Sequence, residues 1–464
     1  MRLRTTLTLV STTLVLPALL AAGCSSGGGK NKGGSPVSSA ALAFTTPVLS
    51  TSQTAARVGS SAVALVFKLQ SPAGAQEVTL TGLTIQAAGS VDEANALGGL
   101  RLISDDDRDG FIDPGEATLA TVASPAFAAD NGSATIAPAT SVVIPAGGQG
   151  RQFIVAVETG PNGPNAAAQM GQTIRLGVAS AADVALVDPA GQPAGASGTF
   201  PAWAAPVTLY LHDHLLITEV VTLPAGAEYI ELFNPTPAAA TLTNVYITDH
   251  TVSGSPTSLY QNIAAGANFA PAAANATDFC ARFPAGTTIA PGQALVIAVD
   301  GTAFRAAWGR DADHCLRGAV AGVSSQQMLT PAGTTWTATA VANTVDLRDG
   351  GEPVVVFYFD PQVANRVFDV DYVFWGAAVG ADQHVDKSGV TVAGFTYPAE
   401  TPAAAQTAVD GPLPVPTQNA LRRVAFSEGS EKQSGGSGLL GGHDETSEPW
   451  ATTFGIAVPT PGAP

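Results

Sequence analysis

The chain has 464 residues, of which 45% are hydrophobic and 12% charged, and its formal net charge is −17 at pH 7. A chain of this length exceeds what one hydrophobic core supports, so two domains are expected. Its 37 acidic residues outnumber the 20 basic ones. This balance argues against the basic stripe that a nucleic-acid-binding surface requires, and no nucleic acid is expected among the partners.

The first residues have the order of a secretory signal peptide. Arg2 and Arg4 precede an apolar run of 14 residues, Leu7–Leu20, and small residues follow it as at a cleavage site. A run of this length is short for a membrane span, which needs about 20 apolar residues. The pattern predicts a signal peptide over residues 1–23.

The residues around Cys24 resemble the lipobox of bacterial lipoproteins, although Ala21 stands where leucine is commoner. The resemblance implies that Cys24 receives a diacylglyceryl thioether, becomes the new N-terminus and attaches the chain to a membrane. Ser25, rather than aspartate, favours transport to the outer membrane or cell surface. The alternatives are an ordinary signal peptide and a short transmembrane anchor.

Residues 24–44 are predicted to be the lipidated N-terminus and a flexible tether, because their Gly- and Ser-rich start lacks apolar periodicity. Beyond them the pattern is that of strands. Apolar side chains alternate with polar or small ones over residues 173–178, and residues 61–69 and 153–157 are more continuously apolar. No helical period of useful length stands out. Residues 45–205 are therefore predicted to form a β-sandwich.

A twelve-residue acidic segment, DDDRDGFIDPGE, occupies residues 105–116 of this first predicted domain. Its spacing fits a calcium-binding loop, with Gly110 at the sixth position for the sharp turn. Because the acidic groups repel one another without a cation, a structural calcium site is predicted, and a solvated acidic turn is the alternative. The candidate ligands are Asp105, Asp107, Asp109, the Phe111 carbonyl, Asp113 and Glu116.

The residues on either side of this segment are not those of EF-hand helices. Residues 99–104 (GLRLIS) and 117–122 (ATLATV) have the composition of strands, so the segment is predicted to be an insertion in a β-hairpin. It resembles the Asp-rich, EF-hand-like calcium loops of dockerins, thrombospondin-type repeats and secreted bacterial sandwich domains. A single loop of this kind favours a structural calcium site over a sensor.

The sequence His212-Asp213-His214 lies where the second domain is expected to begin. Strand alternation would place both imidazoles on one face, as half of a metal site, but no third ligand is identifiable. The prediction is therefore a junction strand with solvated polar residues, and a metal site is the alternative. His314 and His443 carry still weaker signals. Ser437, in SGGSGLL, lacks the Gly-x-Ser-x-Gly elbow, so no hydrolase triad is indicated.

Residues 215–234 read LLITEVVTLPAGAEYIELFN and resemble the opening hairpin of the lamin-tail domain. The resemblance continues through four later segments and a Pro-rich end: residues 241–249, 283–300, 345–360, 368–376 and 459–464. That family has an immunoglobulin-like β-sandwich and acts mainly as a binding or structural module. The resemblance therefore implies that residues 206–464 form a second, immunoglobulin-like sandwich with loop insertions.

Strand alternation divides the side chains of this second predicted sandwich between two faces. Glu231 is expected to point away from the core, because side chains alternate along a strand. The core is expected to contain Ile217, Ile230, Leu232, Val296 and Val355.

Cys280 and Cys315 are the cysteines that remain once Cys24 is assigned to lipid attachment. An even number of cysteines in an oxidising compartment predicts a disulfide between them. Two separate buried thiols are the alternative.

The chain is thus predicted to be an all-β, surface-anchored lipoprotein with calcium as its cofactor and no enzymatic activity. Its expected role is that of a structural, adhesive or protein-binding module, whose partners are the membrane and envelope or surface proteins. The alternative is an extracellular hydrolase, or an enzyme accessory, with a site built from loop residues. Carbohydrate binding is a third option, disfavoured by an aromatic fraction of only 6%.

Overall fold

The computed structural model of the chain describes most residues from 39 onward. Residues 39–43, which were predicted to belong to the flexible tether, form a strand that pairs with residues 68–70 and 195–197. The segment with the predicted signal peptide and the lipid attachment residue Cys24 lies outside the described residues. Those described are 39–43, 55–72, 74–160, 169–251, 260–266, 278–318, 326–331, 345–362, 364–376, 384–409, 419–428, 430–439 and 442–464.

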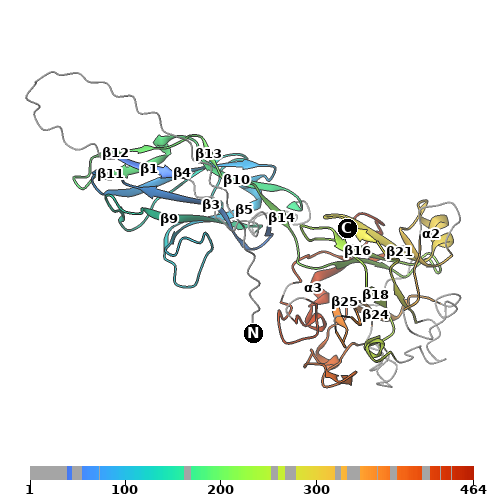
Figure 1. The fold of residues 1–464 in the computed structure, drawn as a ribbon. Helices are drawn as coiled ribbons and strands as arrows, with labels where there is room; N and C mark the ends of the chain where they lie inside the picture. Colours follow the sequence, from blue (N-terminus) through green and yellow to red (C-terminus); the bar gives the residue numbers. More distant parts are fainter. Residues whose placement is uncertain are drawn as a thin grey trace, which may run out of the picture. The chain divides into compact units, whose positions relative to one another are not determined.

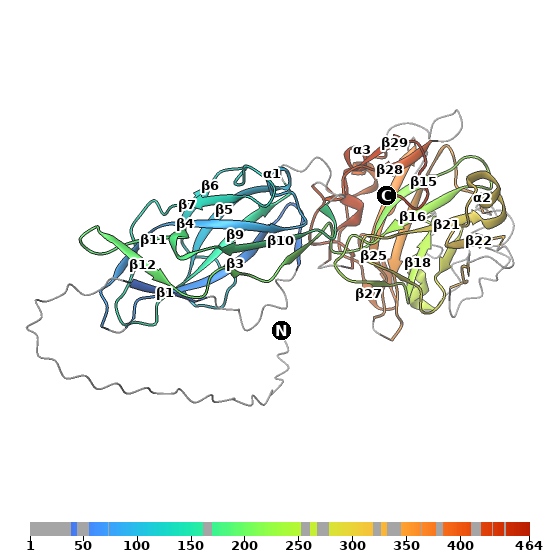
Figure 2. The same ribbon diagram turned by 90° about the horizontal axis from the view of Figure 1, so that it is seen from above.

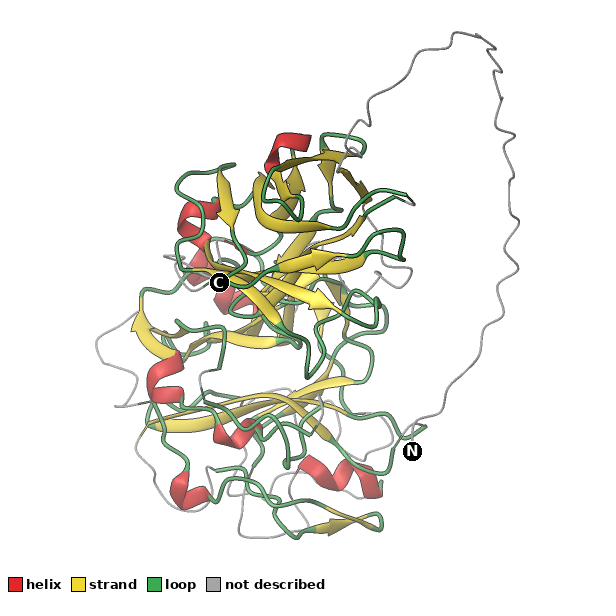
Figure 3. Ribbon diagram, turned by 90° about the vertical axis from the view of Figure 1, so that its left-hand side faces the viewer, coloured by secondary structure: helices red, strands yellow, loops and turns green. Residues whose placement is uncertain are grey.

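The fold is all β, as the sequence predicts, and strands hold far more of the described residues than helices do (Figure 3). The α-helices are short: α1 spans Glu93–Ala96, α2 spans Gly301–Trp308 and α3 spans Trp450–Thr453. Among the described residues, no helix is long and apolar enough to cross a membrane.

The strands up to Tyr210 form one continuous, hydrogen-bonded sheet of fourteen strands (Figure 1). The main path runs β2-β14-β10-β4-β11-β12-β1-β3-β9-β5-β6, with β13 on β10 and with β7 and β8 on β4. The strands are β1 Ser39–Ala43, β2 Ala55–Arg57, β3 Ser61–Gln70, β4 Val78–Gly89, β5 Leu97–Asp105, β6 Thr118–Val122, β7 Ser133–Ile136, β8 Val142–Ile144, β9 Arg151–Thr159, β10 Thr173–Val178, β11 Val184–Val187, β12 Pro193–Ser197, β13 Ala202–Trp203 and β14 Val207–Tyr210.

This set of strands encloses a single hydrophobic core. Alternate residues of β4 and β10, among them Leu80, Ile85 and Leu176, share one buried cluster with Phe67 of β3 and Phe153 of β9. The part of the sheet that contains β4 and β10 therefore packs across the core against the part that contains β3 and β9, as in a sandwich. Because β14 pairs with β10 and β2, the chain leaves this set only after residue 210.

The strands from residue 216 onward form a seven-stranded and a four-stranded sheet (Figure 2). Their orders are β23-β22-β21-β16-β15-β28-β29 and β19-β18-β24-β25, and β17-β20 and β26-β27 are two-stranded. The strands are β15 Leu216–Val221, β16 Tyr229–Phe233, β17 Ala240–Thr241, β18 Val245–Thr248, β19 Cys280–Arg282, β20 Thr288–Ile289, β21 Ala294–Asp300, β22 His314–Arg317, β23 Gln326–Gln327, β24 Gly351–Tyr358, β25 Phe368–Gly376, β26 Thr391–Val392, β27 Phe395–Thr396, β28 Ala420–Arg423 and β29 Phe454–Ala457.

The predicted hairpins of this region are confirmed as hairpins β15-β16 and β24-β25. The seven-stranded sheet turns Ile217, Ile230 and Leu232 toward the four-stranded sheet, where they meet Val355 of β24 in one core cluster. Four of the five predicted core residues thus share this cluster. Val296 does not, because alternation along β21 places it on the opposite face, under Phe304 of α2.

Glu231 lies on the opposite face of β16 from Ile230, as predicted, but it is buried there. Its carboxylate accepts hydrogen bonds from the Thr218 hydroxyl at 2.7 Å and from the Gly462 N–H at 2.6 Å. The neighbouring Glu219 carboxylate accepts the Thr460 N–H at 3.0 Å. Two carboxylates of the opening hairpin therefore hold residues 460–462 against the sheet.

We expect Ile230→Ala to lower the free energy of unfolding by about 2 to 5 kcal/mol, because it removes a buried branched side chain. Ile456→Ala makes the same chemical change in β29 of the same sheet at a side chain that is 46% exposed, against 1% for Ile230. Its cost should stay within about 0.5 kcal/mol. Denaturant unfolding of both variants measures the difference, and equal costs would contradict the core assignment.

A pH dependence follows from Glu231, whose burial raises the pKa of its carboxyl from 4.5 to about 7. The folded protein then binds this proton more tightly than the unfolded chain does. The stabilising contribution of Glu231 is therefore complete below about pH 4.5 and is lost as the pH rises to about 7. This loss lowers the free energy of unfolding by at most about 3 kcal/mol. Glu231→Gln should flatten this slope in denaturant unfolding, whereas the exposed Glu77→Gln should leave it unchanged.

Candidate metal centres

The predicted calcium loop connects β5 and β6, which pair antiparallel. The prediction that strands flank the loop is thus confirmed. Ile112 of the loop packs on the outer face of the neighbouring strands, against a buried cluster that includes Ile103 of β5 and Ile154 of β9. This contact fixes the loop to the sheet.

The acidic side chains of the loop converge in two overlapping groups that share Asp107. One group holds Asp105, Asp107 and Glu116, the other Asp107, Asp109 and Asp113; in each, the candidate ligand atoms lie within 4.8 Å of one another. Phe111 donates its N–H to Asp109 Oδ1 at 2.8 Å. The use of the Phe111 carbonyl as a ligand stays a prediction.

Asp105 is the most buried acidic residue of the loop, with 2% of its surface exposed. Its Oδ2 accepts hydrogen bonds from the Gly110 N–H at 3.0 Å and from Gln152 Nε2 at 2.7 Å. Its Oδ1 is buried and has no hydrogen-bond partner among the described residues. Burial raises the pKa of this carboxyl, although the two hydrogen bonds oppose the shift.

Glu116 links the two ends of the loop. Its Oε1 lies 3.2 Å from the Asp106 N–H and its Oε2 lies 3.0 Å from the Asp113 N–H, so each oxygen accepts a hydrogen bond from one end. The Asp106 side chain, which is off the ligand pattern, instead accepts a hydrogen bond from the Ser104 hydroxyl at 2.6 Å.

The disulfide predicted between Cys280 and Cys315 is not formed, and both residues are buried thiols. Cys280 belongs to the core between the two sheets, whereas Cys315 of β22 packs on the outer face of the seven-stranded sheet with Phe304. The sheet itself therefore separates the two sulfur atoms. The structure therefore agrees with the alternative prediction, that of two separate buried thiols.

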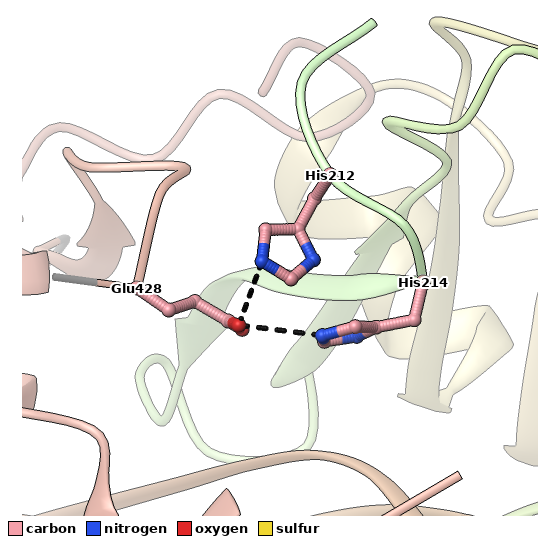
Figure 4. A group of neighbouring side chains, drawn as sticks. All are labelled: His212, His214 and Glu428. Carbon is pink, nitrogen blue, oxygen red and sulfur yellow. Dashed lines mark ion pairs between the residues drawn. The ribbon is translucent and has the colours of Figure 1, made fainter. Parts of the chain in front are cut away.

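A second cluster of metal-ligating side chains gathers around His212 and His214 (Figure 4). Both histidines lie in the bend between β14 and β15, and Glu428 follows β28. Their Nε2 atoms are 3.0 and 3.3 Å from the same Glu428 Oε2, and all three residues are buried. The prediction of solvated residues on a junction strand is therefore wrong, because both histidines are buried and lie in a bend. The alternative, in which both imidazoles converge, agrees with the structure.

Further metal-ligating residues extend this cluster. His214 also groups with His443 and Glu445, and Glu428 groups with Asp371 and Glu445; the candidate ligand atoms of each group lie within 4.8 Å of one another. All of these residues are buried. The cluster thus joins residues that are more than 200 positions apart in the chain.

The buried charges of this cluster perturb one another. Burial lowers the pKa of His212 to about 4, which keeps its imidazole neutral. Burial opposes ionisation of Glu428 as well, but the imidazoles of His214 and His212 hold the pKa of that carboxyl well below its usual range. Burial and the Glu428 carboxylate raise the pKa of Glu431 to about 10.

The glycines on either side of Ser437 allow the chain to approach the His443 segment closely. A Cβ at Gly436 would lie 2.4 Å from the His443 carbonyl oxygen, and one at Gly438 would lie 2.7 Å from the same oxygen. The Gly438 N–H donates to this oxygen at 2.8 Å. The glycine-rich sequence therefore serves close backbone packing.

Ser437 itself takes part in a buried ionic network and not in a triad. Its hydroxyl donates to the carboxylates of Glu400 and Asp369. The Lys387 ammonium contacts the same two carboxylates and lies 2.9 Å from the Tyr260 hydroxyl. The charges of this network are paired within it, which is typical of a structural role.

Most residues of the second cluster could not be identified from the sequence. The spacing of His212 and His214 drew attention to that pair, and His443 was noted as a weaker signal. Nothing local marks Glu428 or Glu445 as their partners, because the contacts depend on β28 pairing with β15.

Comparisons with known proteins add little to this picture. No protein-family model matches the sequence, and no curated protein matches it. The chain is similar to a crystal structure of a DUF4876 family protein from Bacteroides thetaiotaomicron VPI-5482, with 11% identity over 80% of this chain and 94% of that chain. The TM-score is 0.31, a level at which the likeness carries no argument.

Proposed function

We propose that the chain is a lipid-anchored surface protein that acts as a non-catalytic structural, adhesive or protein-binding module, stabilised by calcium in the loop at residues 105–116. Residues 206–464 would supply a lamin-tail-like sandwich. Envelope or surface proteins would be its partners, and Cys24 would attach it to the outer membrane or cell surface.

The observation that carries the calcium assignment is the unpaired oxygen of Asp105. A buried carboxylate oxygen without a hydrogen bond is unfavourable unless a cation or a proton compensates it. Asp107 and Glu116 bring two further carboxylates to the same point. Calcium takes six to eight oxygen ligands in flexible geometry, so a loop whose candidate ligands are all oxygen atoms suits it.

The support for a lamin-tail-like module is the arrangement of strands after residue 216. The hairpins β15-β16 and β24-β25 occupy the segments on which the resemblance was based, and they contribute to the two facing sheets. Thr460 and Gly462 donate their N–H groups to carboxylates of the first hairpin. Such a rigid framework suits a binding module.

We expect calcium to raise the free energy of unfolding of the full chain, and Asp105→Asn to abolish the increase. With a dissociation constant of about 0.1 to 1 mM, about 10 mM calcium should contribute about 1.4 to 2.7 kcal/mol. Thermal melts in calcium and in chelator measure it. Asp106→Asn is the matched control and should keep the calcium response, because Asp106 bonds Ser104 and not the centre of the loop. Identical wild-type melts in both conditions would leave the loop as a solvated turn.

Anchoring is tested at Cys24, whose thiol is required for the thioether. Cys24→Ser should move the protein from the detergent phase to the aqueous phase in detergent partitioning of cells that produce it, because two or more acyl chains are needed for stable attachment. Ser25→Ala should partition like the wild type. Retention of Cys24→Ser in the detergent phase would refute lipid anchoring.

A further inference from the structure

We propose that His212, His214 and Glu428 form a buried binding site for one divalent transition-metal ion of the zinc type, with His443 and Glu445 as its flanking ligands. This site is separate from the calcium loop, and it goes beyond the proposed structural role.

The separations of the donor atoms fit a small metal ion. Glu428 Oε2 lies 3.0 Å from His212 Nε2 and 3.3 Å from His214 Nε2. Tetrahedral zinc with bonds of about 2.0 to 2.1 Å holds its ligand atoms about 3.3 Å apart. The three side chains therefore need little movement to share one ion (Figure 4).

The orientation of the His214 ring suits a metal ligand. Its Nδ1 lies 2.8 Å from the Leu215 carbonyl oxygen, which can only accept, so Nδ1 carries a proton. The other ring nitrogen, Nε2, lies 3.3 Å from Glu428 Oε2. Metal-bound histidines usually donate their other N–H to a carbonyl or carboxylate in this way.

The ionic contacts of these atoms are the ion pairs that they make with one another and with Arg423. Both ring nitrogens of His212, Nε2 of His214 and both oxygens of Glu428 are buried without a hydrogen-bond partner among the described residues. The nearest guanidinium is that of Arg423, whose Nη1 lies 3.7 Å from Glu428 Oε1. That guanidinium already bonds Asp371 and Glu448 at 2.9 and 2.6 Å.

The backbone at Glu428 supports the same conclusion. Glu428 has a φ of 52°, in the left-handed region that non-glycine residues rarely adopt. Such conformations cluster at functional sites, where the surrounding structure holds a side chain in place. Here the strained residue is the one whose carboxylate meets both imidazoles.

The donor atoms select the class of metal. Imidazole nitrogens suit zinc, copper, iron and nickel, whereas calcium and magnesium prefer oxygen ligands alone. Among the described residues, the calcium loop offers only oxygen atoms and this cluster offers nitrogen from up to three histidines. The two sites should therefore bind different ions without competing.

The test is a titration of the full chain, stripped with chelator and held in about 10 mM calcium so that the loop is occupied. Zinc binding is followed by calorimetry, and cobalt replaces zinc for visible absorption. We expect one equivalent of zinc to bind, and cobalt to give the intense bands of a tetrahedral nitrogen and oxygen site. Absence of zinc binding by the wild type would overturn the proposal, as would a cobalt spectrum of octahedral, water-like form.

Variants then locate the ion. Glu428→Gln and His214→Gln should each weaken zinc affinity at least about tenfold. His384→Gln changes a buried histidine outside the cluster and should leave the affinity within about twofold of the wild type. Equal losses in His214→Gln and His384→Gln would refute the assignment. X-ray absorption of zinc-loaded wild type, which must show imidazole ligands, decides the question without reliance on how any variant folds.

Asp105→Asn separates this proposal from the calcium assignment. It should remove the calcium response and leave the zinc stoichiometry at one. Loss of zinc binding in Asp105→Asn would place the zinc in the loop and overturn the proposal, whereas loss of the calcium response alone would support both assignments.

Discussion

The second half of the structure depends on the buried guanidinium of Arg423. Its Nε donates to the Ile217 carbonyl oxygen at 2.8 Å, and its Nη atoms bind the carboxylates of Asp371 and Glu448. Arg423 ends β28 of the seven-stranded sheet and Asp371 lies in β25 of the four-stranded sheet, so this one side chain joins both layers. Removing one partner of such a buried pair costs about 3 to 5 kcal/mol, because the other charge is left unpaired. The interaction also sets the position of Glu428, five residues further along the chain.

The sequence predicted those parts of the fold that local pattern controls. Alternating or continuous apolar residues located β3, β9 and β10, and the two hairpins after residue 216 formed where they were expected. The acidic loop could be predicted because all of its ligands lie within twelve residues. Its strand flanks could be predicted because residues 117–122 have no helical periodicity.

The remaining features depend on contacts between distant segments. Val296 was assigned to the wrong face because nothing in β21 indicates that α2 covers its outer side. Glu231 points away from the core, as expected, but nothing in the sequence near it indicates that residues 460–462 cover it. Cys280 and Cys315 were expected to pair because an even number of cysteines remained after Cys24, but the seven-stranded sheet lies between them. The histidine cluster is the clearest case, since Glu428 and Glu445 come from the chain after β28.

The pairing of β15 with β28 has a consequence for the order in which the protein folds. Glu219 of β15 lies opposite Arg422 of β28, so β15 can pair on this side only with a strand about 200 residues later in the chain. Contacts of such sequence separation slow folding, because a long loop must close before they form. Until β28 is synthesised, the seven-stranded sheet lacks two strands and the cluster around His214 lacks Glu428 and Glu445. The second region can therefore complete its sheet and its histidine cluster only when nearly the whole chain has left the ribosome.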